Sequence, residues 1–143
     1  MELNYGYLYL FKQIDDCLQK RANQLLEPLG LTFSQFRVII VLREREKDRQ
    51  MTSVKDIEER LNVSHPTVIG LLRRLEEKGI VRTETGVADR RVRNVFLAKS
   101  DPAVWEYIRD KWDENETQLM AGLSREEAKT LYELLGRVLK NLS

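Results

Sequence analysis

The stretch SVKDIEERLNVSHPTVIGLLRRLEEKGIVRTETGVADRRVRNVFL, residues 53–97, decides the fold of this chain. Its apolar residues first recur at steps of three and four between Val54 and Leu61, which predicts a three-turn helix with one buried face. The next two residues, Asn62-Val63, leave room only for a sharp turn before a second helix capped by Ser64. Two short helices joined by such a turn are typical of a helix-turn-helix.

The second helix has an apolar side and a side that is small, polar and cationic. The expected buried stripe is Val68, Leu71, Leu72 and Leu75. The other side carries His65, Pro66, Thr67, Ile69, Gly70, Arg73 and Arg74. A helix with small polar side chains in its first turn and cations further along suits the major groove of DNA, because it can contact base edges and phosphates at once. We therefore interpret the chain as a transcription regulator.

Gly70 is unfavourable in the middle of this helix. Glycine there costs about 1 kcal/mol relative to alanine. Beside the exposed Ile69, the cost is explained if the helix must approach a flat surface closely or contact a thymine methyl group. The alternative is tight packing of Gly70 against another element of the same chain.

A basic hairpin is predicted after the second helix, which ends at Lys78-Gly79. Two β-rich runs, residues 80–83 and 94–97, flank a loop that holds Gly86 and the cluster Asp89-Arg90-Arg91. We expect a wing in which one arginine enters the narrow minor groove while Asp89 holds a neighbouring arginine in place. As a generic basic loop, the cluster would carry no function.

The charge of the chain is balanced overall but uneven along its length. There are 24 Lys and Arg against 23 Asp and Glu, a formal net charge of +1, which excludes a protein that coats nucleic acid by charge alone. Residues 64–99 hold eight cationic and four acidic side chains, whereas residues 100–143 hold six and nine. This pattern indicates a phosphate-facing patch on a nearly neutral body, with chance clustering as the alternative.

Cysteine and histidine are too scarce for a disulfide framework or a Cys/His metal cluster within one chain, since Cys17 and His65 are the only ones. They also supply no convincing nucleophile with an adjacent base, so we expect neither enzyme activity nor a cofactor. The absence of disulfides suits a reducing, cytoplasmic compartment. The longest apolar run, residues 38–42, is too short to cross a membrane, and we expect no membrane partner.

Amphipathic helices are expected on both sides of the helix-turn-helix. An apolar stripe from Leu3 to Leu25 predicts a first helix over residues 3–29 that needs a partner surface. A capping box at Thr32 and Gln35 begins a second helix, whose residues 36–42 are apolar on nearly every side and form the expected core. The charged run at residues 43–50 is most simply a solvated helix end and loop, and we assign it no function.

Two further helices are expected after the wing. Asp101-Pro102 begins the first, and a capping box from Ser124 to Glu127 begins the second. Their apolar stripes are Val104, Ile108, Trp112 and Leu119, then Ala128, Leu131, Leu135, Val138 and Leu142. These stripes need burial, either in a two-fold dimer, which we favour, or against the chain's own lobe.

In order and spacing, five stretches resemble the multiple antibiotic resistance regulator (MarR) family of winged helix-turn-helix repressors. They are Gly30-Leu31-Thr32-Phe33-Ser34-Gln35-Phe36, Val63-Ser64-His65-Pro66-Thr67-Val68, Leu75-Glu76-Glu77-Lys78-Gly79-Ile80-Val81, Asp89-Arg90-Arg91 and Leu123-Ser124-Arg125-Glu126-Glu127. The resemblance covers nearly the whole chain. It implies one mainly α domain over residues 1–143 with a small β-hairpin wing.

The resemblance also implies a homodimer that binds double-stranded DNA at a pseudo-palindromic operator. Residues 1–30 and 101–143 would be dimerisation helices, and residues 31–100 would be the DNA-binding lobe. Carried over by position, the base-reading residues are Ser64, His65, Pro66, Thr67, Gly70 and Arg73. Arg74 would lie near the backbone, Arg90 or Arg91 in the minor groove, and Asp89 would orient the wing. His65 could instead bind a phosphate or face solvent, and Arg73 could pair with Glu77.

Family members often release DNA when a small aromatic or phenolic compound binds between the dimerisation helices and the lobe. The aromatic residues available for such a cleft are Tyr7, Tyr9, Phe11, Trp105, Tyr107 and Trp112, although helical spacing more often marks core residues. Some relatives sense peroxides through a cysteine near the start of the first helix, where this chain has Leu8. We expect Cys17, about two turns later, to be a core filler rather than a redox switch.

Residues 98–102, Ala-Lys-Ser-Asp-Pro, depart from the family pattern, which usually has a threonine and a glycine before the next helix. This departure bears on the hinge between lobe and helices and therefore on any effector response. The competing function is a winged-helix protein-interaction module that does not bind DNA. Such modules tend to lose the wing arginines and the polar first turn, both of which this chain retains.

Overall fold

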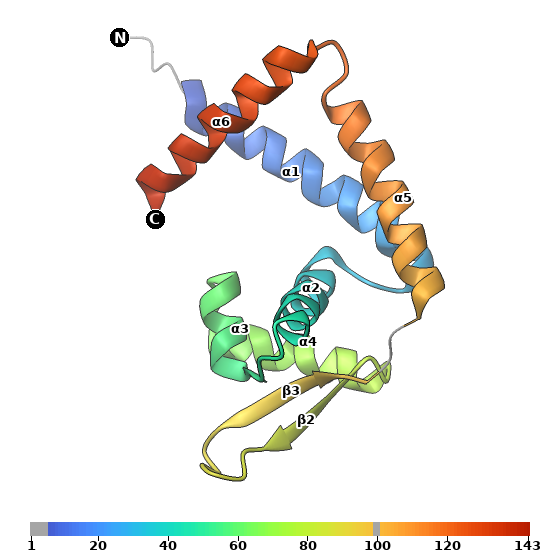
Figure 1. Ribbon diagram of the computed structural model, residues 1–143, viewed down its shortest axis with the longest axis vertical. Coiled ribbons are helices and arrows are strands. Elements are labelled where there is room, and N and C mark those ends of the chain that lie inside the picture. The colour runs from blue at the N-terminus through green and yellow to red at the C-terminus, as the bar shows by residue number, and fades with distance from the viewer. Residues whose placement is uncertain (1–5, 99–100) are drawn as a thin grey trace. The chain divides into compact units, whose positions relative to one another are not determined.

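The computed structural model of the chain describes residues 6–98 and 101–143. Its elements, in order, are α1 (Gly6–Leu26), a 3-10 turn η1 (Glu27–Leu29), α2 (Phe33–Lys47), β1 (Thr52–Ser53), α3 (Val54–Leu61), α4 (His65–Glu77), β2 (Val81–Thr85), β3 (Arg93–Leu97), α5 (Pro102–Leu119) and α6 (Arg125–Leu142) (Figure 1). There are two compact units, the first ending at Pro102 and the second beginning at Ala103. The predicted fold class, mainly α with a β-hairpin wing, is confirmed.

Helix α2 is the core of the first unit. It packs against α1, α3, α4 and β3, which is why its sequence is apolar on nearly every side. Its buried apolar side chains are Phe36, Val38, Ile39, Val41 and Leu42, and Ile40 is half-buried. The predicted core helix is therefore confirmed.

Three capping boxes define the starts of α2, α3 and α6, and those at Thr32 and Ser124 were predicted. The Thr32 hydroxyl accepts the backbone N–H of Gln35 at 3.2 Å, and the Ser53 hydroxyl accepts that of Asp56 at 3.1 Å. The Ser124 hydroxyl accepts the backbone N–H of Glu127 at 3.1 Å. In each case the side chain three residues on accepts the cap residue's own N–H. Both orphan donors at each helix start are thereby satisfied.

A three-stranded antiparallel sheet, with strand order β1-β3-β2, completes the lobe. In the hairpin, Val81 pairs with Leu97 and Thr85 with Arg93, so the strands extend closer to the tip than residues 80–83 and 94–97 predicted. The third strand, Thr52–Ser53, was not predicted, because two residues carry no detectable alternation. Thr52 is buried and pairs with Val95, which ties the start of α3 to the hairpin.

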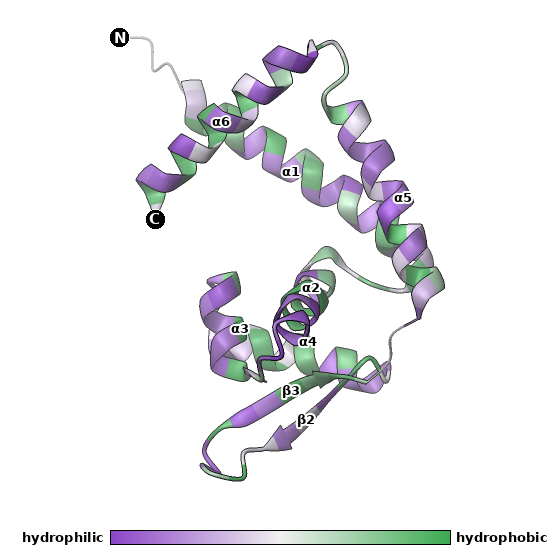
Figure 2. Cartoon of the chain, in the orientation of Figure 1, coloured by the Kyte–Doolittle hydropathy of each residue, from purple (hydrophilic) through white to green (hydrophobic). Residues whose placement is uncertain are grey.

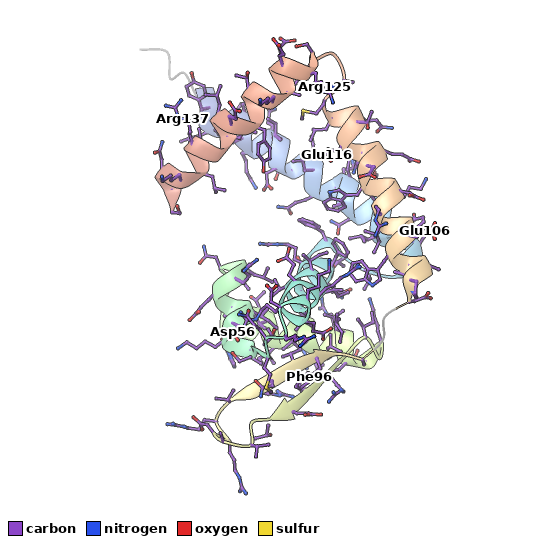
Figure 3. All side chains as sticks on the ribbon, in the orientation of Figure 1. Asp56, Phe96, Glu106, Glu116, Arg125 and Arg137 are labelled. Carbon is purple, nitrogen blue, oxygen red and sulfur yellow. The ribbon has the colours of Figure 1, made fainter. Side chains whose placement is uncertain are left out.

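The charged run at residues 43–50 is the mostly exposed helix end and loop that the sequence predicted, but some of its side chains also join other elements. Arg45 donates from Nε to the Thr52 hydroxyl at 3.0 Å, and from Nη2 to the Met51 carbonyl at 2.8 Å and to Asp56 Oδ2 at 3.3 Å. Figure 3 shows Asp56 on α3. Glu46 Oε1 accepts the backbone N–H of Leu97 at 3.2 Å. Local charge pattern could not reveal these partners, since they come from other elements.

Helix α1 is buried only near its C-terminal end, through Ala22 and Leu26. The predicted helix to residue 29 is correct except that its last turn is a 3-10 turn. Leu3 lies outside the described residues. The rest of the predicted stripe is exposed within the chain, from Tyr7 (82%) to Leu18 (37%). Cys17 is exposed as well, so the expectation of a core filler is wrong for the single chain.

The second unit contains α5 and α6. Within α5 Ile108 is buried, whereas Trp112 and Leu119 are 40% and 44% exposed. Helix α6 has no buried residue, and Figure 2 shows hydrophobic and hydrophilic residues alternating along it. Its exposed large apolar side chains are Tyr132, Leu134, Leu135, Val138, Leu139 and Leu142. Of the unusual junction at residues 98–102, Lys99 and Ser100 lie outside the described residues.

Among the described residues, no single helix has both the length and the hydropathy needed to cross a membrane. Residues 6–29 and α2 satisfy the test only as a pair bent by 78°. Because α2 is the buried core helix, its apolar character is already explained by packing inside the lobe.

Candidate nucleic-acid interface

The turn between α3 and α4 is built from three local hydrogen-bonding features. Asn62 takes a left-handed conformation, with φ of 52°, and its backbone N–H donates to the Glu58 carbonyl, a role to which asparagine is well suited. Ser64 then caps α4, accepting the backbone N–H of Thr67 at 3.4 Å. The two hydroxyls of Ser64 and Thr67 lie 2.9 Å apart. The predicted helix-turn-helix is confirmed.

The buried side of α4 fixes which side faces outward. All four predicted stripe residues are buried, and Val68 and Leu75 are completely inaccessible. On the opposite side, Arg73 and Arg74 are exposed. Neither forms an ion pair within the part of the chain that the structure describes, so the suggested pairing of Arg73 with Glu77 is not seen there. Two cations are left available to an external anion.

His65, at the first position of α4, points back toward α3. Its Nδ1 lies 3.4 Å from Glu58 Oε1, and its side chain is 62% exposed. The two alternatives for His65, a phosphate contact or exposure to solvent, did not include Glu58 as a neighbour. Sequence reasoning missed Glu58 because the turn brings the two residues together across a helix boundary. The histidine remains accessible beside its partner.

Gly70 has no packing role inside the chain. A Cβ built on it meets no heavy atom within 4 Å. Among the described residues the alternative of tight internal packing is therefore wrong, and no contact there offsets the helix-propensity cost of glycine. The residue leaves an open position on the outward side of α4.

The wing loop distinguishes its two neighbouring arginines. Arg91 is held by Asp89 through Nε–Oδ1 and Nη2–Oδ2 contacts, both of 3.1 Å, and through its backbone N–H at 3.0 Å. These bonds from Arg91, chiefly from its side chain, hold the pKa of Asp89 below its ordinary value. Arg90 is exposed and has no ion pair among residues 6–98 and 101–143. Figure 3 shows long side chains projecting from this loop away from the helices of the first unit.

Gly86 allows the wing loop to close. Its N–H donates to the Val92 carbonyl at 2.8 Å, and the Val92 N–H donates to the Asp89 carbonyl at 3.1 Å. A Cβ on Gly86 would lie 2.6 Å from that same Asp89 oxygen. Any larger residue must therefore displace the backbone that presents Asp89 and its arginines.

Lys78 has a structural partner that the sequence did not indicate. Its Nζ donates to Gln35 Oε1 at 3.0 Å and to the Gly30 carbonyl. Gln35 is buried and also belongs to the capping box of α2. The C-terminal end of α4 is thus joined to the start of α2. A buried glutamine among apolar residues is the one signal that could have indicated such a partner.

A groove of about 850 Å³ lies in the first unit. It is lined by Lys20, Asn23, Gln24, Glu27, Thr32, Ser34, Leu71 and Arg74. None of the six aromatic residues suggested for an effector cleft lines it. The described residues also contain no group of three His, Cys, Asp or Glu arranged to hold a metal ion.

Comparisons with known proteins agree with this geometry. The MarR family model matches residues 29–92. An uncharacterized HTH-type transcriptional regulator of Bacillus subtilis, YwoH, is 35% identical over 139 residues, which is 95% of this chain and 97% of that protein. The chain belongs to the MarR family. It is therefore a DNA-binding transcription regulator of the MarR type, and not an enzyme.

Solved structures extend the match to the fold. The complex of S. aureus MepR with DNA superposes with a TM-score of 0.83 at 30% identity, covering 96% of this chain and 99% of that one. A mutant of E. coli MarR gives a TM-score of 0.76 at 24% identity, with 94% and 96% coverage, a likeness of fold alone. Another relative, the transcriptional activatory protein BadR of Rhodopseudomonas palustris, is 33% identical over 76% of this MarR-family chain and 61% of its own length.

We predict that Gly86→Ala opens the wing loop without unfolding the lobe, because the added methyl displaces the Asp89 carbonyl. Loss of one net hydrogen bond should accelerate exchange of the Val92 amide about ten-fold. Hydrogen exchange followed by NMR measures this. Val87→Ala is the control, since Val87 is fully exposed in the same loop. Equal Val92 exchange rates in the two variants would contradict the assigned role of Gly86.

Proposed function

We propose that the chain is a sequence-specific repressor that binds a pseudo-palindromic operator as a homodimer. In each half-site α4 would occupy the major groove and the β2–β3 hairpin the adjacent minor groove. One observation carries this proposal. The apolar side of α4 is fully used inside the lobe, while its outward side presents an open glycine and two arginines without ion-pair partners in the described residues.

The proposed base-reading residues occupy the first two turns and the outward side of α4. Small polar groups at the helix start allow close approach to base edges, and arginine further along offers a bidentate contact to guanine. We assign base contact to Ser64, His65, Pro66, Thr67, Gly70 and Arg73. Arg74 is assigned to the phosphate backbone. His65 lies beside Glu58 but stays 62% exposed, which leaves its ring accessible for the proposed contact.

In the wing, we assign Arg90 to the minor groove and Asp89 to positioning. Support comes from the difference between the two arginines, because Asp89 already makes a bidentate contact along one edge of the Arg91 guanidinium, through Nε and Nη2. Arg90 has no such competitor among the described residues. A narrow minor groove concentrates negative potential and attracts an arginine of this kind. The Asp89–Arg91 pair would stiffen the loop from which Arg90 extends.

Residues 1–30 and 101–143 are proposed to form the dimer interface. The support is unburied apolar surface on two helices: Leu8 is 85% exposed in α1, and Leu139 is 68% exposed in α6. Large exposed apolar patches are typical of protein–protein interfaces rather than of monomer surfaces. Two lobes related by a two-fold axis would contact half-sites about 34 Å apart, on one face of the duplex.

Repression needs only occupancy of the operator, which a DNA-binding lobe supplies, whereas activation needs a further contact with the transcription machinery. Because the relative BadR is named an activatory protein, activation is the second candidate, and a promoter-reporter assay separates the two.

Release by a small aromatic effector is also proposed. The groove lined by Lys20 and Arg74 favours an aromatic acid over a neutral compound, and competition by phenolic acids in the DNA-binding assay tests it.

A winged-helix module that binds protein instead of DNA is the other function to weigh. Binding to a protein does not explain why a helix-destabilising glycine lies on the outward side of α4. It also does not explain why arginines are exposed on both the helix and the wing. Salt-dependent binding to duplex DNA distinguishes the functions, because neutralising phosphates with arginine and lysine releases condensed counterions, and a protein partner carries no such counterion atmosphere.

We predict different consequences for the arginines of α4 and of the wing. Arg73→Ala should weaken binding to the preferred site by about 1–3 kcal/mol and reduce selectivity, because a base contact is lost. Arg90→Ala should weaken binding and lower the slope of log K against log salt by about 0.9 per half-site. Fluorescence anisotropy over a salt series measures both. Lys129→Ala, which removes one charge from α6, is the control, and three indistinguishable affinities would reject the assignments.

A second prediction concerns stability against binding. Gly70→Ala should raise the free energy of unfolding by about 1 kcal/mol through helix propensity while it lowers operator affinity about ten-fold, since the methyl occupies the approach to the bases. Gly136→Ala is a matched control, because Gly136 also lies inside a helix with no heavy atom within 4 Å of a built Cβ. Urea unfolding and anisotropy are the measurements. If Gly70→Ala binds the operator as tightly as the parent, Gly70 is not part of the DNA interface.

A third prediction addresses assembly. Leu139→Glu places a charge on the apolar face of α6 and should convert the dimer to monomer, with operator affinity falling about ten-fold or more as joint engagement of half-sites is lost. Sedimentation velocity reports the mass. Thr130→Glu adds the same charge to an exposed position outside the apolar stripe and should leave the dimer intact. A dimeric Leu139 variant would exclude this face from the interface.

A further inference from the structure

Three side chains connect the proposed reading helix to the proposed wing. The Thr83 hydroxyl on β2 donates to Glu76 Oε1 on α4 at 2.7 Å. Arg93 on β3 donates from Nη2 to the same Thr83 oxygen at 3.0 Å, and its Nη2 lies 4.0 Å from Glu76 Oε1. We call this set the Glu76–Thr83–Arg93 bridge. It joins the helix to both strands of the hairpin.

The bridge lies where apolar packing of the hairpin ends. Val81 pairs with Leu97 and Thr83 pairs with Val95, so all four side chains lie on one face of the hairpin, the face that meets the helices. Val81 and Val95 are buried and anchor its root. Beyond them, toward the tip, the same face carries no buried apolar side chain. From Thr83 outward, therefore, the hairpin is held to α4 by polar side chains.

The chemistry of the bridge is directional. A threonine hydroxyl has one proton, which goes to the Glu76 carboxylate, and its oxygen accepts from the Arg93 guanidinium. Charge-assisted hydrogen bonds of this kind constrain geometry more closely than a bare ion pair. Because Glu76 and Arg93 are 33% and 51% exposed, their Coulomb attraction is screened and adds little. The bridge therefore acts mainly by fixing the orientation of the hairpin relative to α4.

A small tilt at the bridge has a large effect at the tip. Val87 follows Thr83 by about four residues, and at about 3.3 Å per residue the loop lies roughly 13 Å beyond the bridge. A tilt of about 10° would displace it by roughly 2 Å, enough to break a hydrogen bond. Correct docking of helix and wing on one duplex therefore depends on the angle between them.

We infer that the Glu76–Thr83–Arg93 bridge sets the angle between α4 and the hairpin, and that its three members are positioning residues for DNA binding. This inference rests on the proposed placement of the wing in the minor groove. It also assigns Arg93 a role distinct from that of Arg90, because Arg93 faces the helix rather than the tip. The competing role is direct contact of Arg93 with a phosphate.

Thr83→Val tests the inference, because valine has the shape and strand preference of threonine but no hydroxyl. Arg93 and Glu76 both stay in place, so a direct phosphate contact by Arg93 would survive. Thr85→Val is the matched control, since Thr85 lies two residues along the same strand face and is exposed. Thr83→Ser restores the hydroxyl and should restore binding.

Operator affinity is measured by anisotropy, and minor-groove contact by hydroxyl-radical footprinting on the full-length protein. Thr83→Val should weaken binding about three- to ten-fold, the equivalent of one hydrogen bond, and should remove hydroxyl-radical protection of the flanking minor groove. Thr85→Val and Thr83→Ser should match the parent. In an Arg90→Ala background, Thr83→Val should have no further effect, since no wing contact remains to be positioned.

Each other outcome overturns the inference. If Arg90→Ala does not weaken binding, the wing assignment fails and the bridge has nothing to position. If Arg90→Ala weakens binding but Thr83→Val matches Thr85→Val, the bridge alone is rejected and the wing stands. An equal loss from Thr83→Val with and without Arg90, accompanied by a lower Tm, would show that the hydroxyl stabilises the fold without orienting the wing.

Discussion

Burial of the apolar stripe on α4 is the constraint on which the rest of the structure depends. Val68, Leu71, Leu72 and Leu75 can leave water only by packing into the lobe, where α4 contacts α2 and α3. Four such side chains contribute several kcal/mol of burial, so the rotation of the helix about its axis is fixed. The outward direction of Gly70, Arg73 and Arg74 follows from that rotation. The side of α4 that we propose for DNA contact is thus a consequence of core packing.

The polar contacts that join the elements serve a different purpose from the core. Arg45 connects α2 to the start of α3, Lys78 connects α4 to the start of α2, and Glu76 connects α4 to the hairpin. Each is partly exposed and individually weak. Hydrophobic burial is non-directional and tolerates small tilts, whereas hydrogen bonds do not. These contacts therefore set angles within a lobe whose stability comes from its apolar interior.

A single chain leaves two helices with unsatisfied apolar faces. The first half of α1 and most of α6 expose large apolar side chains such as leucine and tyrosine, even though α6 is amphipathic and well capped. The capping box at Ser124 specifies where α6 begins but not what covers it. In the proposed homodimer these apolar faces would form the surface that joins two copies of the reading unit.

The sequence by itself determined the helices, their caps, the core helix, the helix-turn-helix and the basic hairpin. These are encoded locally, through apolar periodicity, N-cap residues and turn residues such as Asn62 and Gly79, and the structure has them within a few residues of the predicted bounds. The outward face of α4 followed from the same periodicity. Periodicity also identified the stripe on α1, although it wrongly suggested that Cys17 would be buried within the chain.

Tertiary structure alone decided the contacts between elements distant in sequence. The strand at Thr52 and the partners of Arg45, His65, Lys78 and Arg93 depend on a neighbour delivered by another element. The same is true of the difference between Arg90 and Arg91, which look equivalent in the sequence until the loop closes around Gly86. The physical reason is that local patterns report which face of an element leaves water, whereas the pairing of polar side chains is specified only after those faces have packed.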